Sequence, residues 1–148
     1  MKTDETTLVA PCGINCGDCG VHLGKDKPKL IDTLVAMGFD KESLNKESLP
    51  CAGCRAVKGN CPVIGSTCDT YACIGRRGFD FCFECPDFPC AMLNPAADRA
   101  NTLPHNTKVF NLCFIQRQGL DKFLEKASEI KLRYYRGRME IGKGPQLK

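Results

Sequence analysis

The sequence predicts a small α+β domain that is mainly helical, in which an irregular, cysteine-rich segment is held by metal and packs on C-terminal helices. The length, 148 residues, suits one domain. Twelve residues are Cys, whereas Leu, Ile, Val and Phe together number only 34, so the apolar core is small for this length. Helical spacing of apolar residues is clearest after residue 106 and is missing from residues 51–90.

The N-terminal third predicts a short strand, a loop and a helix. Residues 8–11 are apolar and favour a brief strand, and residues 12–20 are too rich in Gly and Cys for regular structure. Asp26 can cap a helix that has Pro28 in its first turn and ends at Gly38. Residues 40–47 favour a further short helical piece.

Residues 51–90 hold eight of the twelve cysteines but only eight Val, Ile, Leu, Met or Phe residues. A segment this poor in apolar side chains needs cross-links to stay folded. The N-terminus lacks the apolar run of a signal peptide, so we expect a cytoplasmic protein. Cysteines in that compartment are typically metal ligands rather than disulfides.

The C-terminal part predicts two helices. The first has Val109, Leu112, Cys113 and Gln116 on one face and ends near Gly119. The second is amphipathic from residue 120 to about 136. We therefore expect one domain over residues 1–148, with a cysteine-rich metal-binding part (8–93), a helical part (106–136) and a basic, flexible tail (137–148).

Three cysteine pairs share a two-residue spacing, which lets one tight turn bring two thiolates to a single ion. They are Cys16 with Cys19, Cys51 with Cys54, and Cys82 with Cys85. Zinc prefers four tetrahedral ligands and accepts thiolates, so it is the expected metal, with two ions per chain. Structural zinc contributes about 10–16 kcal/mol of apparent binding free energy. That is comparable with the whole net stability of a typical domain, about 5–15 kcal/mol.

Three further residues leave the ligand set open. Cys61 is either a ligand or a small apolar side chain in its loop. Cys113 lies between Leu112 and Phe114, so we interpret it as a buried core thiol. His22, three residues after Cys19, is either a nitrogen ligand or a partly exposed loop residue.

Other functions remain as alternatives. Four-cysteine ligation also suits an iron–sulfur cluster for electron transfer. Thiol–disulfide exchange normally uses one such pair at a helix start, whereas three pairs lie in predicted coil here. No catalytic motif is present, and a metal-dependent enzyme would need a ligand set that includes His22, Asp18 or water. The sequence thus favours a binding or scaffold module of unknown role.

The order of motifs resembles a family of small, uncharacterised, cysteine-rich proteins of bacteria and archaea. The matching runs are APCGINCGDC, CAGCR and CDTYACIGRRGFDFCFECPDFPC, over roughly residues 10–93. The resemblance implies a domain of unknown function that is presumed to bind zinc. The family often has an aromatic residue at the position of His22. Its cysteines correspond to Cys12, Cys16, Cys19, Cys51, Cys54, Cys68, Cys73, Cys82, Cys85 and Cys90.

Charge gives a weaker indication of partners. The net charge is +4, and residues 126–148 alone carry seven Lys or Arg against two Glu. This basic end suits either a solvated helix face or contact with an acidic partner or nucleic acid. Tyr134 and Tyr135 could stack on bases or close the helix onto the core. No apolar run is long enough to span a membrane.

Overall fold

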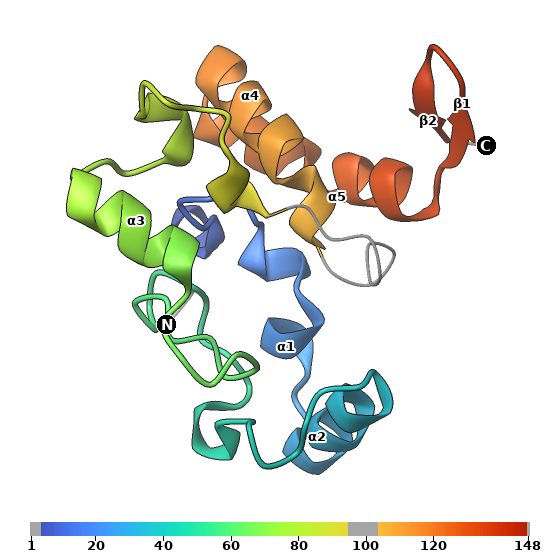
Figure 1. Cartoon of the computed structure of the whole chain (residues 1–148). Helices are drawn as coiled ribbons and strands as arrows, with labels where there is room; N and C mark the ends of the chain where they lie inside the picture. The colour runs from blue at the N-terminus through green and yellow to red at the C-terminus, as the bar shows by residue number, and fades with distance from the viewer. Residues whose placement is uncertain (1–3, 95–103, 148) are drawn as a thin grey trace.

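The computed structural model describes residues 4–94 and 104–147. The chain is mainly helical and ends in a short hairpin (Figure 1). Its elements are α1 (Gly20–Leu23), α2 (Lys27–Ala36), α3 (Asp69–Arg77), α4 (Lys108–Gln118), α5 (Leu120–Arg136), β1 (Arg138–Glu140) and β2 (Gly144–Gln146). Short 3-10 turns lie at η1 (Glu5–Leu8), η2 (Cys16–Asp18), η3 (Lys46–Ser48), η4 (Cys82–Glu84), η5 (Ala91–Leu93) and η6 (Pro104–Thr107).

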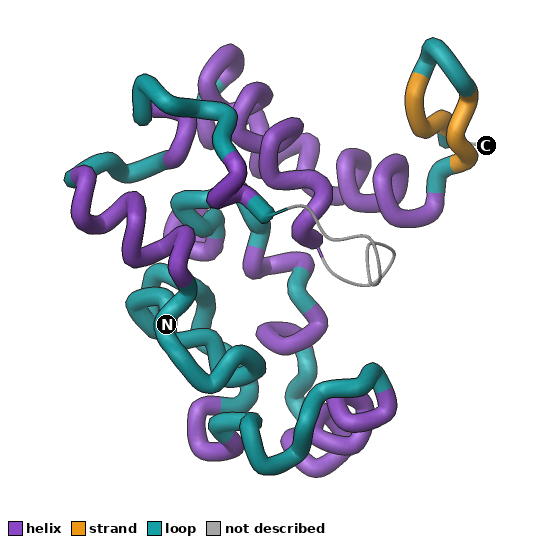
Figure 2. Tube along the Cα trace, in the orientation of Figure 1, coloured by secondary structure: helices purple, strands orange, loops and turns teal. Residues whose placement is uncertain are grey.

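The elements place the cysteine-rich loops in the middle of the molecule. Helices α4 and α5 lie at one end and α2 at the opposite end (Figure 1). Much of the chain between α2 and α3 is loop (Figure 2). No helix among the described residues has both the length and the apolar character needed to cross a membrane.

Helix α2 confirms the predicted helix and its cap. The Asp26 carboxylate accepts a hydrogen bond from the Lys29 amide at 3.1 Å, which satisfies one of the free N–H groups of the first turn. Leu30 and Leu34 are the buried residues of α2. They form a small core with Val21, Leu44, Leu49 and Cys51.

Helix α3 lies in the segment where no helical period was visible. Its buried residues are Thr70 and Ile74, one turn apart, and only Ile74 is aliphatic. The Thr70 hydroxyl donates to the Met92 carbonyl at 2.5 Å. Gly78 ends the helix in the left-handed conformation, with φ 73°. A polar contact and a glycine cap thus define this helix in place of an apolar stripe.

Helices α4 and α5 confirm the two C-terminal helices, with Gly119 between them. The face predicted for the first helix is wrong, because Val109 is 41% exposed. The buried residues of α4 are Lys108, Asn111, Leu112 and Ile115. Lys108 and Asn111 therefore lie on the buried face, and this face cannot be recognised in the sequence from apolar residues alone.

The main core joins the N-terminal segment to these helices. Val9, Leu112 and Phe123 are almost fully buried in it. Ala10, Cys12, Phe81 and Leu93 belong to the same cluster, so the cysteine-rich segment packs directly on α4 and α5.

The expected strand at residues 8–11 is not formed. Residues 5–8 make the turn η1, and the β pairing given for this segment is an isolated bridge between Val9 and Asn15. The described strands instead belong to the antiparallel hairpin β1–β2. It lies within the segment expected to be a flexible tail and projects from the end of α5 (Figure 1).

The two tyrosines of α5 have contacts of their own. Tyr134 packs on Phe110 of α4, with 4.6 Å between the ring centroids. Tyr135 is partly buried, and this burial raises its pKa to about 12. These contacts favour the interpretation that both side chains fix α5 to its neighbours.

Candidate metal centre

The cysteines are divided between two cavities. All twelve are free thiols. A cavity of about 340 Å³, the large cysteine cavity, is lined by Cys12, Cys16, Cys19, Cys51, Cys54, Cys61 and Cys68. A cavity of about 270 Å³, the small cysteine cavity, is lined by Cys73, Cys82, Cys85 and Cys90.

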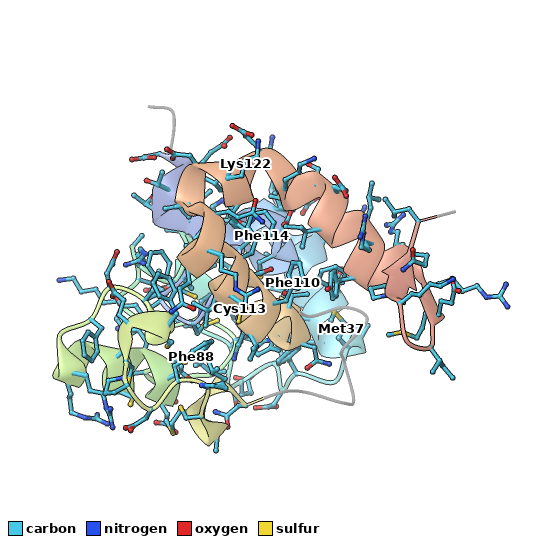
Figure 3. The ribbon with its side chains drawn as sticks, turned by 90° about the horizontal axis from the view of Figure 1, so that it is seen from above. Met37, Phe88, Phe110, Cys113, Phe114 and Lys122 are labelled. Carbon is cyan, nitrogen blue, oxygen red and sulfur yellow. The ribbon has the colours of Figure 1, made fainter. Side chains whose placement is uncertain are left out.

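Only Cys113 lines neither cavity. It lies on α4 beside Phe110 and Phe114 (Figure 3). It is half-buried, so the expected core thiol is less buried than the sequence indicated. Cys61, which the sequence left open, lines the large cavity, as does His22.

The first cysteine loop is shaped by its contact with α4. Gly13 has φ +87°, and a Cβ there would lie 2.6 Å from the Lys108 carbonyl oxygen. The Asn111 side-chain amide donates to the Gly13 carbonyl oxygen at 2.7 Å. Glycine is therefore required between Cys12 and Cys16, because the backbone touches the helix and takes the left-handed conformation.

The second cysteine pair makes hydrogen bonds of the kind expected for a metal knuckle. The Gly53 amide donates to Cys51 Sγ at 3.4 Å. The Cys54 amide donates to Cys16 Sγ at the same distance, which joins the first loop to the second. Backbone N–H groups directed at sulfur stabilise the thiolate form.

Hydrogen bonding and burial give the thiols different acidities. The hydrogen bond from the Cys54 side chain, helped by the Cys54 amide, lowers the pKa of Cys16 to about 6. The same hydrogen bond raises the pKa of Cys54, because Cys54 is the donor. Burial raises the pKa of Cys61 to about 11. Of Cys16, Cys54 and Cys61, Cys16 is thus the thiol that ionises most readily.

The small cavity lies between α3 and the third cysteine pair. Burial raises the pKa of Cys82 to about 12, and the neighbouring thiols of Cys73, Cys85 and Cys90 act in the same direction. Arg77 Nη1 donates to Cys85 Sγ at 2.9 Å and to Asp87 Oδ2 at 2.7 Å. The Arg77 guanidinium is therefore a positive charge held beside the four cysteines of the small cavity.

Two residues of the large cavity were not predicted from the sequence. Lys108 lines it while only 5% exposed, and its Nζ donates to the Leu93 carbonyl at 2.8 Å. Its charge lowers the pKa of Cys12, whereas burial raises that pKa more strongly. Its spacing could have indicated burial, because Lys108 lies four residues before Leu112 and seven before Ile115, on the same face of the helix.

His105 was the second residue missed. It lines the large cavity, and its Nδ1 is buried with no hydrogen-bond partner among the described residues. Burial, and then the nearby charge of Lys108, lower the pKa of His105. No motif in the sequence marks this residue.

The donor set suits zinc, although the donors do not converge. Thiolates and imidazole are ligands that zinc accepts. Over residues 4–94 and 104–147, no three His, Cys, Asp or Glu side chains are close enough together to hold an ion. Asp18 belongs to a different environment, where it accepts from Asn15 Nδ2 at 3.0 Å and lies 3.4 Å from Lys131 Nζ. It lines neither cysteine cavity.

These features define a small helical protein organised around two cysteine clusters. Residues 8–95 match the family described as "Protein of unknown function (DUF3795)", and the chain belongs to this family. The match confirms the resemblance carried by the three cysteine motifs. No curated protein and no solved structure matches the chain.

Proposed function

We propose that this protein binds zinc through its cysteines, with at least one ion in each cysteine cavity. One observation carries the proposal: eleven cysteines, spread over residues 12–90, line two cavities as groups of seven and four. The ten cysteines of the family pattern are all among them. Four thiolates are a complete ligand set for tetrahedral zinc, so the small cavity offers one set, and the large cavity offers one set and three further thiols.

The charges around the cavities support the same proposal. A zinc ion with four thiolates has a net negative charge, which is costly to bury unless a cation lies nearby. Lys108 is such a cation at the large cavity, and Arg77 is one at the small cavity. Among the described residues, the hydrogen bond given for the buried Lys108 is to a carbonyl, and a buried ammonium is costly without a neighbouring anion.

The proposed role of the metal is structural. All-cysteine sites are typical of zinc that stabilises a fold, whereas catalytic zinc keeps a position for water and usually has His ligands. The apolar clusters around the loops are small, so metal would supply the missing stability of residues 51–90. We therefore propose a binding or scaffold module whose surface is held in place by zinc.

Elemental analysis of the full chain, purified under reducing conditions, tests the proposal. We expect two or more zinc ions per chain, and we expect a strong chelator to remove them with loss of helical circular dichroism. Less than one metal ion per chain would contradict metal binding. An unchanged spectrum after complete zinc removal would contradict the structural role.

An iron–sulfur protein is the second candidate, and the size of the large cavity favours it. A cavity of about 340 Å³ lined by seven cysteines has room for a polynuclear centre. Such clusters are held by cysteine thiolates and tuned by hydrogen bonds to sulfur. A visible spectrum of freshly purified protein separates the candidates, because the cluster is brown and zinc–thiolate is colourless.

A further inference from the structure

We propose that His22 is a nitrogen ligand of the metal centre in the large cysteine cavity, binding through Nε2. This inference rests on the proposed metal binding. His22 lies on the one-turn helix α1, three residues after Cys19, and lines the cavity together with the seven cysteines. Figure 1 shows α1 next to the central loops.

The ring of His22 is held by a hydrogen bond of a particular kind. Its Nδ1 lies 2.7 Å from the Cys51 carbonyl oxygen. A carbonyl oxygen only accepts, so Nδ1 carries the proton. In a neutral imidazole, a proton on Nδ1 leaves the lone pair on Nε2. The hydrogen bond to Cys51 thus places the proton on Nδ1, and Nε2 is the ring nitrogen that can serve as a metal ligand.

This arrangement is characteristic of histidines that bind metal. Such a histidine usually donates its other ring N–H to a carbonyl or carboxylate, which fixes the ring and raises its basicity. Here the acceptor belongs to Cys51, the first residue of a cysteine pair in the same cavity. The Cys51 amide also donates to the Val21 carbonyl at 2.9 Å, so two hydrogen bonds attach α1 to the second cysteine loop.

The donor count points in the same direction. Seven thiols are one fewer than two complete tetrahedral sets require. The nitrogen of His22 supplies the eighth donor. An imidazole ligand, unlike a thiolate, adds no negative charge to a centre that has Lys108 as its buried cation.

His105 provides a matched comparison. It lines the same cavity, but its Nδ1 has no hydrogen-bond partner among the described residues, so nothing there fixes the tautomer. Among the described residues, the hydrogen bond that fixes the ring of a metal-binding histidine is thus present at Nδ1 of His22 and not at Nδ1 of His105.

The direct test replaces zinc with cadmium-113 in the full chain and records coupling between the metal and histidine ring protons. We expect one cadmium resonance to couple to the ring of His22. His22→Gln should abolish this coupling and lower the affinity for that ion at least tenfold, whereas His105→Gln should retain both. His22→Cys should restore the lost ion by providing a thiolate.

The outcomes separate this inference from the proposed function. If the unmodified chain takes up neither zinc nor cadmium, the proposed function fails first. If it takes up cadmium but no resonance couples to His22, or if the coupling is to His105, metal binding stands and the His22 assignment is overturned. The coupling is measured on the unmodified chain, so a variant that misfolds does not affect this test.

Discussion

Arg55 and Asp80 connect the loop of the Cys51–Cys54 pair to the segment just before the Cys82–Cys85 pair through two hydrogen bonds. Arg55 Nη1 donates to the Asp80 carboxylate at 2.6 Å, and Nη2 donates to the Asp80 carbonyl at 3.2 Å. Arg55 Nε donates to the Val9 carbonyl at 2.7 Å, and the guanidinium lies 4.8 Å from the centre of the Phe81 ring. One side chain thus joins the segments that carry all three cysteine pairs.

Replacing Arg55 should therefore loosen all three segments together. Val9 is fully buried, so Arg55→Ala would leave its carbonyl without its side-chain donor. An unmet buried acceptor costs about 1–3 kcal/mol, and we expect the free energy of unfolding to fall by about 2 kcal/mol. Arg55→Lys should recover only part of this loss, because a single ammonium group cannot make the hydrogen bonds that the planar guanidinium makes in three directions. Urea unfolding of the zinc-loaded protein measures both variants, and a loss below 0.5 kcal/mol (roughly the size of an ordinary surface substitution) would contradict the bridging role.

Gly13 should tolerate no side chain. In Gly13→Ala the new Cβ would lie 2.6 Å from the Lys108 carbonyl oxygen and 2.8 Å from Leu112 Cγ, at a φ of +87°. Overpacking and left-handed strain each cost about 1–3 kcal/mol, so we expect a loss of about 3 kcal/mol. Gly75→Ala is the control, because its Cβ meets nothing within 4 Å inside α3. That change should stabilise by up to about 1 kcal/mol. Thermal unfolding compares the two, and equal effects would show that the contact with α4 is unimportant.

The sequence shows which cysteines form closely spaced pairs, but it does not show how the cysteines group in space. Spacing identified the three pairs, because a turn of two intervening residues is a local property. It did not show that Cys73 belongs with the third pair and Cys68 with the first two, since the helix α3 that separates them has no apolar stripe. Cys61 stayed undecided for the same reason: its cavity is assembled from distant loops.

The C-terminal helices show a different limit of prediction from sequence. Their existence followed from spacing and from Gly119, but the buried face of α4 did not. Lys108 and Asn111 are buried because they meet carbonyl groups, Leu93 and Gly13 respectively. A sequence pattern counts such residues as solvent-facing, because charged and amide side chains are rarely buried without partners. The partners become visible only in three dimensions.

Stability should depend on pH with opposite signs in two ranges. The pKa of Cys16 is lowered from the usual 9.0 to about 6 by its hydrogen bond with Cys54. Its contribution is therefore complete above pH 9 and is lost as the pH falls through about 6. In the metal-free chain, burial raises the pKa of Cys61 to about 11 and of Cys82 to about 12, so their contributions there are lost as the pH rises through those values. Metal binding adds to the first effect, because protons compete for thiolates.

Urea unfolding at fixed free zinc between pH 5.5 and pH 9 checks the effect predicted for Cys16 in the lower range. We expect the free energy of unfolding to rise across the range. Cys16→Ser should flatten the rise between pH 6 and 9, whereas Cys113→Ser, outside both cavities, should leave the profile unchanged. Greater stability at pH 5.5 than at pH 8 would refute the assignment.

Arg77 should affect how tightly the small cavity holds zinc but should not be needed for the folded structure. Its guanidinium donates to Cys85 Sγ and to Asp87, and it comes from the last turn of α3. A donor to a ligand atom stabilises the thiolate, and loss of such a partner typically weakens metal binding by about 10–100-fold. We expect Arg77→Met to speed zinc release from the small cavity about tenfold and to leave the circular dichroism spectrum unchanged. The neighbouring Arg76, exposed and without a hydrogen bond or ion pair among the described residues, supplies the control Arg76→Met. Release is followed with a colorimetric chelator, and equal rates in the two variants would mean that the bond from Arg77 to Cys85 has no influence on the metal.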